Sequence, residues 1–381
     1  YVSAGLSITS AAMTVILGAA AMAGFSFAGP VGLAAGAMLA IGSQVYGAVR
    51  IVDDIDDYIE LTLDERWRTG WFSFCMADID QHVQDRYIKA KTLLQHSIKL
   101  KATARKLLDG PLKDSTEAII NGQFEVRLRP TRVWKRNWWT KRDAWESVHV
   151  PEIVGLDDTI DAREGVTQNT PGAELGTPAD NKSVMWLLAE GRDSIKGVEK
   201  KPNVFHYKSG KKDLTGGEKN DQFVFDNAAE FLKQDVDATE HSILRGGAGQ
   251  DTLVLGGRYS DYRTDKTGYD VDLLAGTLQI ISTDKSSEQG KKYALHSLLD
   301  GIENVETVNG AASVVTGTAQ SNLIKARGSD VIEAGAGDDQ IYLLHKNAKA
   351  SGEAGADQYL IAHVAGRFSI FEDGKQPSHI V

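Results

Sequence analysis

The chain has 381 residues, which exceeds the roughly 250 to 300 residues at which single hydrophobic cores stop growing. We therefore expect two or three structural units. The formal net charge is −10, and the acidic excess lies after residue 150, which argues against nucleic acid as a partner. A lone cysteine, Cys75, excludes an internal disulfide framework and leaves the compartment open; it is expected to be a small buried hydrophobe in a helix.

Residues 1–49 contain no charged residue, and Gly29-Pro30 divides them into two apolar stretches of about membrane-spanning length. This pattern predicts a hydrophobic helical hairpin. Its Ala and Gly content makes it only moderately hydrophobic, which favours conditional membrane insertion over a permanent anchor; a buried hairpin without a membrane role is the other alternative. The residues expected to enter the bilayer are Ile8, Val15, Leu17, Phe25, Phe27, Val31, Leu33, Leu39 and Ile41.

An acidic cluster follows directly, and its proposed pH-sensing members are Asp53, Asp54, Asp56 and Asp57. Carboxylates must be protonated before they approach lipid at low cost, so this cluster would make insertion acid-triggered. Acidic residues are also favoured in the first turns of a helix by the macrodipole, which is an equally simple explanation. Both explanations stay open at this point.

Residues 50–112 are expected to form two or three helices, because their apolar residues recur with helical periodicity. We expect a break near Thr69-Gly70 and a stop at Gly110-Pro111. After that proline the apolar period changes to two, which predicts a β-rich connecting region over residues 113–185 with a loop at 165–182.

Tryptophans and basic residues alternate between Arg127 and Trp145. The tryptophans are Trp134, Trp138, Trp139 and Trp145, and the basic residues are Arg127, Arg129, Arg132, Lys135, Arg136, Lys141 and Arg142. Such residues more often pack a sheet edge, with arginines over the aromatic rings. The alternative is a recognition surface for lipid headgroups, an acidic glycan or a single-stranded nucleic acid.

The sequence GGAGQDTLV at Gly246–Val254 fits the nonapeptide GGxGxDxUx at every specified position, where U is a large apolar residue. A weaker copy spans Gly216–Val224, and a trace remains at Gly191, Asp193 and Ile195. In this repeat the glycines allow turns with positive φ, the aspartate faces a calcium ion and the apolar residue fills a parallel β-roll. The pattern predicts an RTX-like β-solenoid, or β-roll, over residues 186–381.

A nine-residue register continues toward the C-terminus, with Val314, Leu323, Ile332, Ile341, Ala350 and Tyr359 expected inside at the eighth positions. Alternate blocks stack on one side, so carboxylates at the sixth position must recur every 18 residues to share an ion. Asp339 and Asp357 satisfy this and form the best calcium candidate, followed by Asp251. Asp330 is expected to face Ala348 and Ala312. A structural repeat without calcium is the alternative.

The segments VPEIVGLDDTIDAREGV at Val150–Val166 and LTGGEKNDQFVF at Leu214–Phe225 resemble the makes-caterpillars-floppy insecticidal toxins of insect-associated bacteria. Residues 1–60 are more distantly similar to the end of the translocation region in large clostridial glucosylating toxins. The resemblance implies a secreted toxin with effector, membrane-inserting and cell-binding parts, of which this chain joins the last two. The implied partners are the host-cell or endosomal membrane, an unknown host receptor and upstream domains of the same toxin.

An enzyme is not expected, because the chain lacks HExxH, GxSxG, P-loop and Cys-His motifs. We therefore expect an α+β protein that serves toxin delivery, with Ca²⁺ as its sole candidate cofactor. A calcium-binding structural or adhesive region of another secreted protein is the alternative. That alternative would not need the uncharged residues 1–49.

Overall fold

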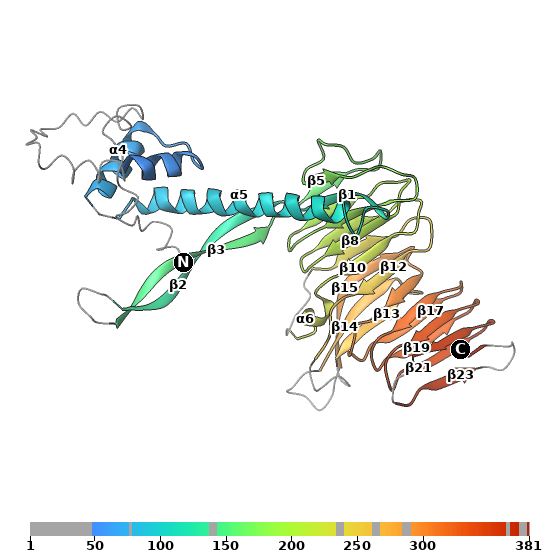
Figure 1. Cartoon of the computed structure of the whole chain (residues 1–381). Helices are drawn as coiled ribbons and strands as arrows, with labels where there is room; N and C mark the ends of the chain where they lie inside the picture. The colour runs from blue at the N-terminus through green and yellow to red at the C-terminus, as the bar shows by residue number, and fades with distance from the viewer. Residues whose placement is uncertain are drawn as a thin grey trace, which may run out of the picture. The chain divides into compact units, whose positions relative to one another are not determined.

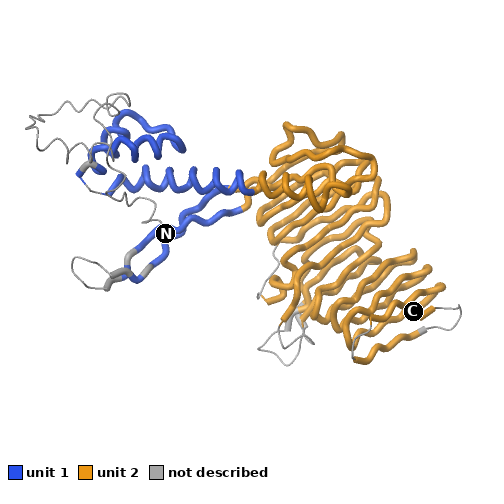
Figure 2. Tube along the Cα trace, in the orientation of Figure 1, with its two compact units in different colours: residues 1–99, 125–154 blue, residues 100–124, 155–381 orange. Residues whose placement is uncertain are grey.

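The computed structural model describes residues 48–75, 78–136, 143–233, 240–260, 267–283, 291–362, 366–372 and 379–380. The chain divides into two compact units (Figure 2): unit 1 comprises residues 1–99 and 125–154, and unit 2 comprises residues 100–124 and 155–381. The predicted α+β class is confirmed, with most of the regular structure in strands. The expected hydrophobic hairpin lies outside the described residues except for its last two. Within the described ranges, no helix has the length and apolar character needed to cross a bilayer.

Unit 1 contains helical residues 48–56, helix α4 (Leu63–Phe74) and the first part of α5 (Gln81–Leu108). The first helix forms because its apolar residues recur on one face, and this face packs against α5. The resulting core contains Ile51, Val52, Ile55, Leu61, Val83 and Tyr87. The predicted helical periodicity is therefore confirmed in this region.

Helix α4 runs without interruption through Thr69-Gly70, so the break expected there is wrong. A single glycine costs a helix about 1 kcal/mol, which the capping box between Thr62 and Glu65 helps to offset. The helix ends instead at its C-cap, Cys75, which is exposed rather than buried as expected. By contrast, α5 ends at Leu108, directly before the predicted stop at Gly110-Pro111.

Strands β2 (Phe124–Arg136) and β3 (Asp143–Gly155) form a two-stranded sheet of their own. The period-two pattern that starts at Phe124 is thus confirmed as a strand. Val126 is buried, whereas Trp134 and Trp145 are exposed. Trp138, Trp139, Lys141 and Arg142 lie outside the described residues.

Unit 2 contains two large sheets, each with eleven described strands (Figure 1). Sheet 1 consists of β1 (Thr116–Asn121), β5 (Ala173–Leu175), β6 (Ser183–Leu187), β8 (Asn203–Tyr207), β10 (Gln222–Phe225), β12 (Thr252–Leu255), β16 (Asn304–Glu306), β18 (Leu323–Ala326), β20 (Gln340–Leu343), β22 (Gln358–Ile361) and β24 (His379–Ile380). Sheet 2 consists of β4 (Thr159–Asp161), β7 (Asp193–Lys196), β9 (Lys212–Thr215), β11 (Ser242–Arg245), β13 (Gly268–Asp272), β14 (Thr277–Thr283), β15 (Lys291–Asp300), β17 (Val314–Thr318), β19 (Val331–Gly335), β21 (Lys349–Glu353) and β23 (Ser369–Glu372).

Successive strands from β6 to β12 and from β16 to β24 alternate between the two sheets, and their pairings within each sheet are parallel. The exceptions are β5, antiparallel to β1, and the antiparallel insertion β13-β14-β15. In most of these strands every second residue is buried, and these residues form one core shared by both sheets. Within it, the rings of Trp186, Phe205 and Phe223 stack with centroids 5.9 and 5.1 Å apart.

The large sheets begin earlier in the chain than the sequence indicated. Strand β1 starts at Thr116, and the boundary expected at residue 186 falls inside β6. The uneven spacing of the motif aspartates also has a structural cause. Asp193 lies in sheet 2 while Asp221 and Asp251 lie in sheet 1, and helix α6 (Ala228–Phe231) is inserted between the last two.

The nine-residue register is confirmed for the eighth positions Ile332, Ile341, Ala350 and Tyr359, all of which are buried. It is wrong for Val314 and Leu323, which are half-buried, while Val315 and Ile324 occupy the core. Ile324 pairs with Ile341 after 17 residues, whereas Ile341 pairs with Tyr359 after 18. A shift of one residue moves every side chain to the other face of its strand.

Candidate functional site

Sheet 1 carries a row of polar residues at the position of the motif aspartate, which we call the carboxylate ladder. Its members are Asn203, Asp221, Asp251, Glu303, Asn322, Asp339 and Asp357, all of them buried except Glu303, which is half-buried. The side-chain oxygen of one member accepts the backbone N–H of the member on the preceding strand, except between Glu303 and Asn322, where Asn322 Nδ2 donates to the Glu303 carbonyl oxygen. The N to Oδ1 distance is 2.6 Å from Asp221 to Asp251 and 2.9 Å from Asp339 to Asp357.

The glycines of GGAGQD form the tight turn that directly precedes Asp251 of the ladder. Gly247 and Gly249 have φ of +102° and +126°, a region that only glycine adopts at low cost. Gly246 is needed for space, since a Cβ atom there would lie 1.9 Å from the Gly301 carbonyl oxygen and 2.3 Å from Asp251 Oδ2. The predicted role of the motif glycines in turn formation is therefore confirmed.

The calcium candidates Asp339 and Asp357 are direct neighbours across β20 and β22, as the 18-residue spacing predicted. The Oδ1 atoms of Asp357, Asp339 and Asp251 each accept a hydrogen bond from a backbone N–H of the neighbouring ladder member. Among the described residues, Oδ2 of Asp251 and Oδ2 of Asp339 are buried without a hydrogen-bond partner. These two atoms are the ones that would face a cation.

Calcium takes six to eight oxygen ligands. The described part of the chain contains no group of three or more His, Cys, Asp or Glu side chains placed to hold a metal ion. Calcium at these aspartates therefore fits only if main-chain carbonyls complete the shell, and it stays a prediction. Asp330 does face Ala348 as expected, but its other neighbour is Ser313 and not Ala312. The backbone N–H of Ser313 donates to Asp330 Oδ1 at 2.8 Å.

Burial changes the acidity of the ladder. Loss of solvent raises the pKa of Asp251 and of Asp339 to about 7, and that of Asp221 to about 6, although the backbone N–H donors oppose the shift. Asp330 in sheet 2 behaves similarly, with its pKa raised to about 6 by burial. Unit 2 thus contains several carboxyl groups that change charge between neutral and mildly acidic pH.

Sheet 2 contains a buried ion pair that sequence reasoning missed. Lys212 Nζ lies 2.7 Å from Asp193 Oδ2 and 2.8 Å from the carbonyl oxygens of Ala189 and Gly191, and both charged side chains are almost fully buried. Burial lowers the pKa of Lys212, and the carboxylate of Asp193 opposes this shift. An inward position within the alternating strand Lys212–Thr215 is the signal that could have located this lysine.

A polar groove of about 360 Å³ lies beside the ladder, where β10, β12, β16, β18 and β20 meet the solvent. Its amide-bearing residues are Asn220, Gln222, Gln250, Asn304, Asn322 and Gln340. Amides both donate and accept hydrogen bonds without charge. The groove can therefore bind neutral polar groups such as hydroxyls. Sequence reasoning missed it because most of its residues, such as Gln222, Gln250 and Gln340, come from outward positions that the repeat does not specify.

The acidic cluster of unit 1 lies at the end of the helix formed by residues 48–56, not at its start. Asp53, Asp54 and Asp56 occupy the last turn, where the helix dipole opposes negative charge, so the macrodipole explanation is wrong for them. It is confirmed for Asp64 and Glu65 of the same acidic stretch, which lie in the first turn of α4. Partial burial and the nearby carboxylate of Asp57 raise the pKa of Asp53. Asp56 is half-buried, pairs with Arg66 and accepts the N–H of Leu61 at 3.1 Å.

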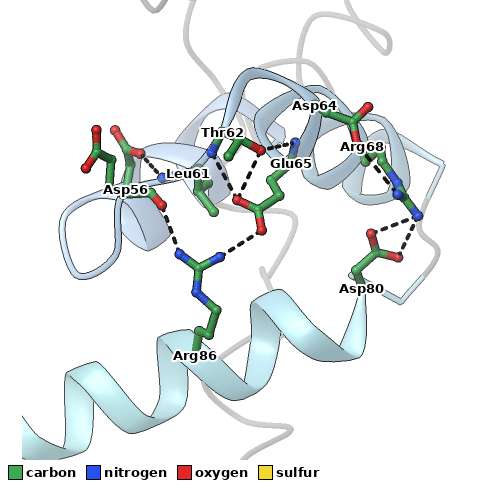
Figure 3. A network of polar contacts seen from close by, with 9 residues as sticks. Asp56, Leu61, Thr62, Asp64, Glu65, Arg68, Asp80 and Arg86 are labelled. Atoms are coloured by element: carbon green, nitrogen blue, oxygen red, sulfur yellow. Dashed lines mark hydrogen bonds and ion pairs between the residues drawn. The ribbon is translucent and has the colours of Figure 1, made fainter.

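A polar network holds the start of α4 to α5 (Figure 3). Arg86 of α5 donates to Glu65 Oε1 at 2.7 Å and to the Glu60 carbonyl oxygen at 3.0 Å. Arg68 lies 3.1 Å from Asp80 and 3.6 Å from Asp64. The N–H of Thr62 and the guanidinium of Arg86 hold the pKa of Glu65 below its usual value.

The residues expected to enter a bilayer, Ile8 to Ile41, lie outside the described ranges. The chain matches no protein-family model and no curated protein. Its function must therefore be argued from its own residues.

Proposed function

We propose that this chain is a non-catalytic delivery part of a large secreted bacterial toxin of the insecticidal type described above, acting at the host-cell or endosomal membrane. In this proposal, residues 1–49 insert into the bilayer at acidic pH. Unit 2 serves as an RTX-like β-solenoid that carries cell binding. Upstream domains of the same toxin supply the effector activity.

One observation carries the proposal: a stretch of 49 uncharged residues leads directly into a helix whose end collects four carboxylates. Partial burial and then repulsion by the carboxylate of Asp57 raise the pKa of Asp53 at this end of the helix. Protonation therefore removes charge at the junction between the apolar segment and unit 1. A junction without charge approaches lipid at a lower cost than a charged one.

The repeat motif and the regular strand spacing support the solenoid part of the proposal. Parallel partners lie 17 or 18 residues apart from β16 onward for most pairs, which is two nine-residue units for each return to the same sheet. Stacked units of this kind present long, regular outer faces. The amide-lined groove beside the ladder offers such a face to an unknown host receptor.

A calcium-binding structural or adhesive region is the second candidate, and the unpartnered Oδ2 atoms of Asp251 and Asp339 favour it. A cation at these atoms would satisfy buried oxygens that the described residues leave without donors. This candidate gives residues 1–49 no role.

Vesicle flotation tests the delivery proposal. The chain is mixed with vesicles at pH 7.5 and 4.5, and a chain lacking residues 1–47 serves as the comparison. Flotation that resists a high-salt wash is expected only at pH 4.5 and only with the full chain. Salt-resistant flotation of the shortened chain would contradict the assignment of insertion to the uncharged segment.

A further inference from the structure

The β2-β3 hairpin of unit 1 exposes two tryptophans side by side. The side chains of Trp134 and Trp145 are 57% and 64% exposed, and their ring centroids lie 5.2 Å apart in an edge-to-face arrangement. Tryptophan is highly buried in most folded proteins, so a solvent-facing pair on one hairpin lacks a role in the core. The alternative in which these rings pack a sheet edge under arginines does not describe this pair.

An exposed arginine lies beside the pair on the same hairpin. Arg129 and Arg132 are both exposed, and the alternation of side chains along β2 places Arg132 on the face of Trp134 and Arg129 on the opposite face. Arg127 lies nearer the start of the strand and pairs with Glu125 at 2.5 Å. A basic aromatic surface is unexpected in a chain with a net charge of −10. We call Trp134, Trp145 and Arg132 the tryptophan–arginine surface.

We infer that the tryptophan–arginine surface binds the headgroup region of an anionic lipid bilayer. Indole rings partition into the membrane interface because their apolar body and polar N–H suit its two sides. A guanidinium group donates two parallel hydrogen bonds to the oxygens of one phosphate, and its positive charge attracts the hairpin to a negatively charged surface. The choice of a bilayer as partner rests on the proposed delivery function, but this contact needs neither acid nor residues 1–49.

The ring geometry favours lipid over nucleic acid. Single-stranded bases bind by stacking on open ring faces, whereas an edge-to-face pair turns one ring's edge toward the other ring's face. Insertion into headgroups needs only exposed ring surface, and both rings supply it. An acidic glycan shares the negative charge and is therefore an outcome that the test must separate.

Helix α4 offers a matched comparison within the same unit. Trp67 and Trp71 are 50% and 42% exposed and stack with centroids 5.6 Å apart. Arg66 and Arg68 flank Trp67, but carboxylates pair with both: Asp56 with Arg66, and Asp64 and Asp80 with Arg68. If charge decides, the α4 pair contributes little to binding of an anionic surface at neutral pH, although its exposed apolar area is similar.

The test measures co-sedimentation of the full chain at pH 7.4 with phosphatidylcholine vesicles containing 0 or about 30% phosphatidylserine. Two variants alter the surface: Trp134→Ala with Trp145→Ala, and Arg132→Glu. The control variant combines Trp67→Ala with Trp71→Ala. Circular dichroism checks that each variant remains folded, and Arg132→Lys tests whether charge alone suffices.

We expect the full chain to bind only the anionic vesicles, and more weakly as salt rises. Arg132→Glu removes one positive charge and adds one negative charge, and each unit of charge changes binding by about fivefold, so the Glu variant binds about 25-fold more weakly. The tryptophan double variant binds at least about tenfold more weakly, the Lys variant keeps most of the affinity, and the α4 control binds as the parent does.

Equal binding by the hairpin variants and the parent would overturn the inference, as would heparin binding without vesicle binding. Comparison with the insertion test at pH 4.5 separates a failure of this inference from a failure of the delivery proposal. Binding at pH 7.4 that needs the hairpin, without insertion at pH 4.5, would leave the inference standing and remove the delivery function. Insertion at pH 4.5 with unaltered binding by the hairpin variants would do the reverse.

Discussion

Replacing Asp339 by Asn should stabilise unit 2 at neutral pH, although the substitution removes an aspartate of the repeat motif. The carboxyl is fully buried, and its pKa is raised to about 7. Oδ1 accepts the N–H of Asn322 at 2.8 Å, and an amide oxygen can replace it. Asparagine already occupies ladder positions 203 and 322, where its Nδ2 donates to backbone carbonyl oxygens.

The sign and size of the effect follow from the shifted pKa. Because the folded-state pKa lies above the ordinary value of 3.8, the folded chain binds the extra proton between about pH 4 and 7. Stability therefore falls as pH rises through this window and is lowest above it. A shift of about three units corresponds to about 4 kcal/mol at pH 8. The neutral amide escapes most of this cost, and we expect a net gain of about 1–3 kcal/mol.

Urea unfolding followed by circular dichroism, with EDTA present, measures the free energy of unfolding between pH 4 and 8. The parent and Asp339→Asn should have similar stability near pH 4 and diverge as pH rises. Asp338→Asn is the matched control, because it removes the same charge from an exposed neighbour. A variant that is less stable than the parent at pH 8, or that keeps the parent's full pH dependence, would refute the reasoning.

Three further outcomes are expected. Lys212→Met should destabilise the fold by about 3–5 kcal/mol in urea unfolding, because it leaves the carboxylate of Asp193 buried and unpaired; a loss below about 1 kcal/mol would contradict the role of the pair. Gly246→Ala should lower the melting temperature by several degrees, while Ala248→Ser in the same exposed turn should not, since a Cβ at 246 meets a backbone carbonyl. Exchange of EDTA for millimolar calcium should leave the parent's melting temperature unchanged; a rise that Asp339→Asn abolishes would support the calcium-binding alternative instead.

Features set by local pattern were predictable from the sequence. The helical face at Ile51 and Ile55, the stop after Leu108 and the glycine turns around Asp251 each depend on residues within a few positions of one another. Even so, local signals were insufficient at Gly70, which is tolerated within α4 because the capping box and the i,i+4 stacking of Trp67 on Trp71 favour the helix.

Features that depend on distant strands were not predictable. The register error at Val314 and Leu323 arises from a shortening by one residue, which becomes visible in the 17-residue pairings of Val315 with Ile332 and of Ile324 with Ile341. Likewise, the contact of Lys212 with Asp193 joins neighbouring strands of one sheet. The pKa of Asp339 depends on burial by residues from several strands, which no local motif encodes.

Release of a trapped dye from anionic vesicles between pH 7.5 and 4.5 tests the proposed delivery function most directly. The full chain is compared with a variant in which Leu17→Asp and Leu39→Asp place charges in the uncharged segment, each costing about 3 kcal/mol in a bilayer. We predict release by the parent only toward pH 4.5 and little release by the variant. No release by the parent at any pH, or equal release by both, would contradict the account.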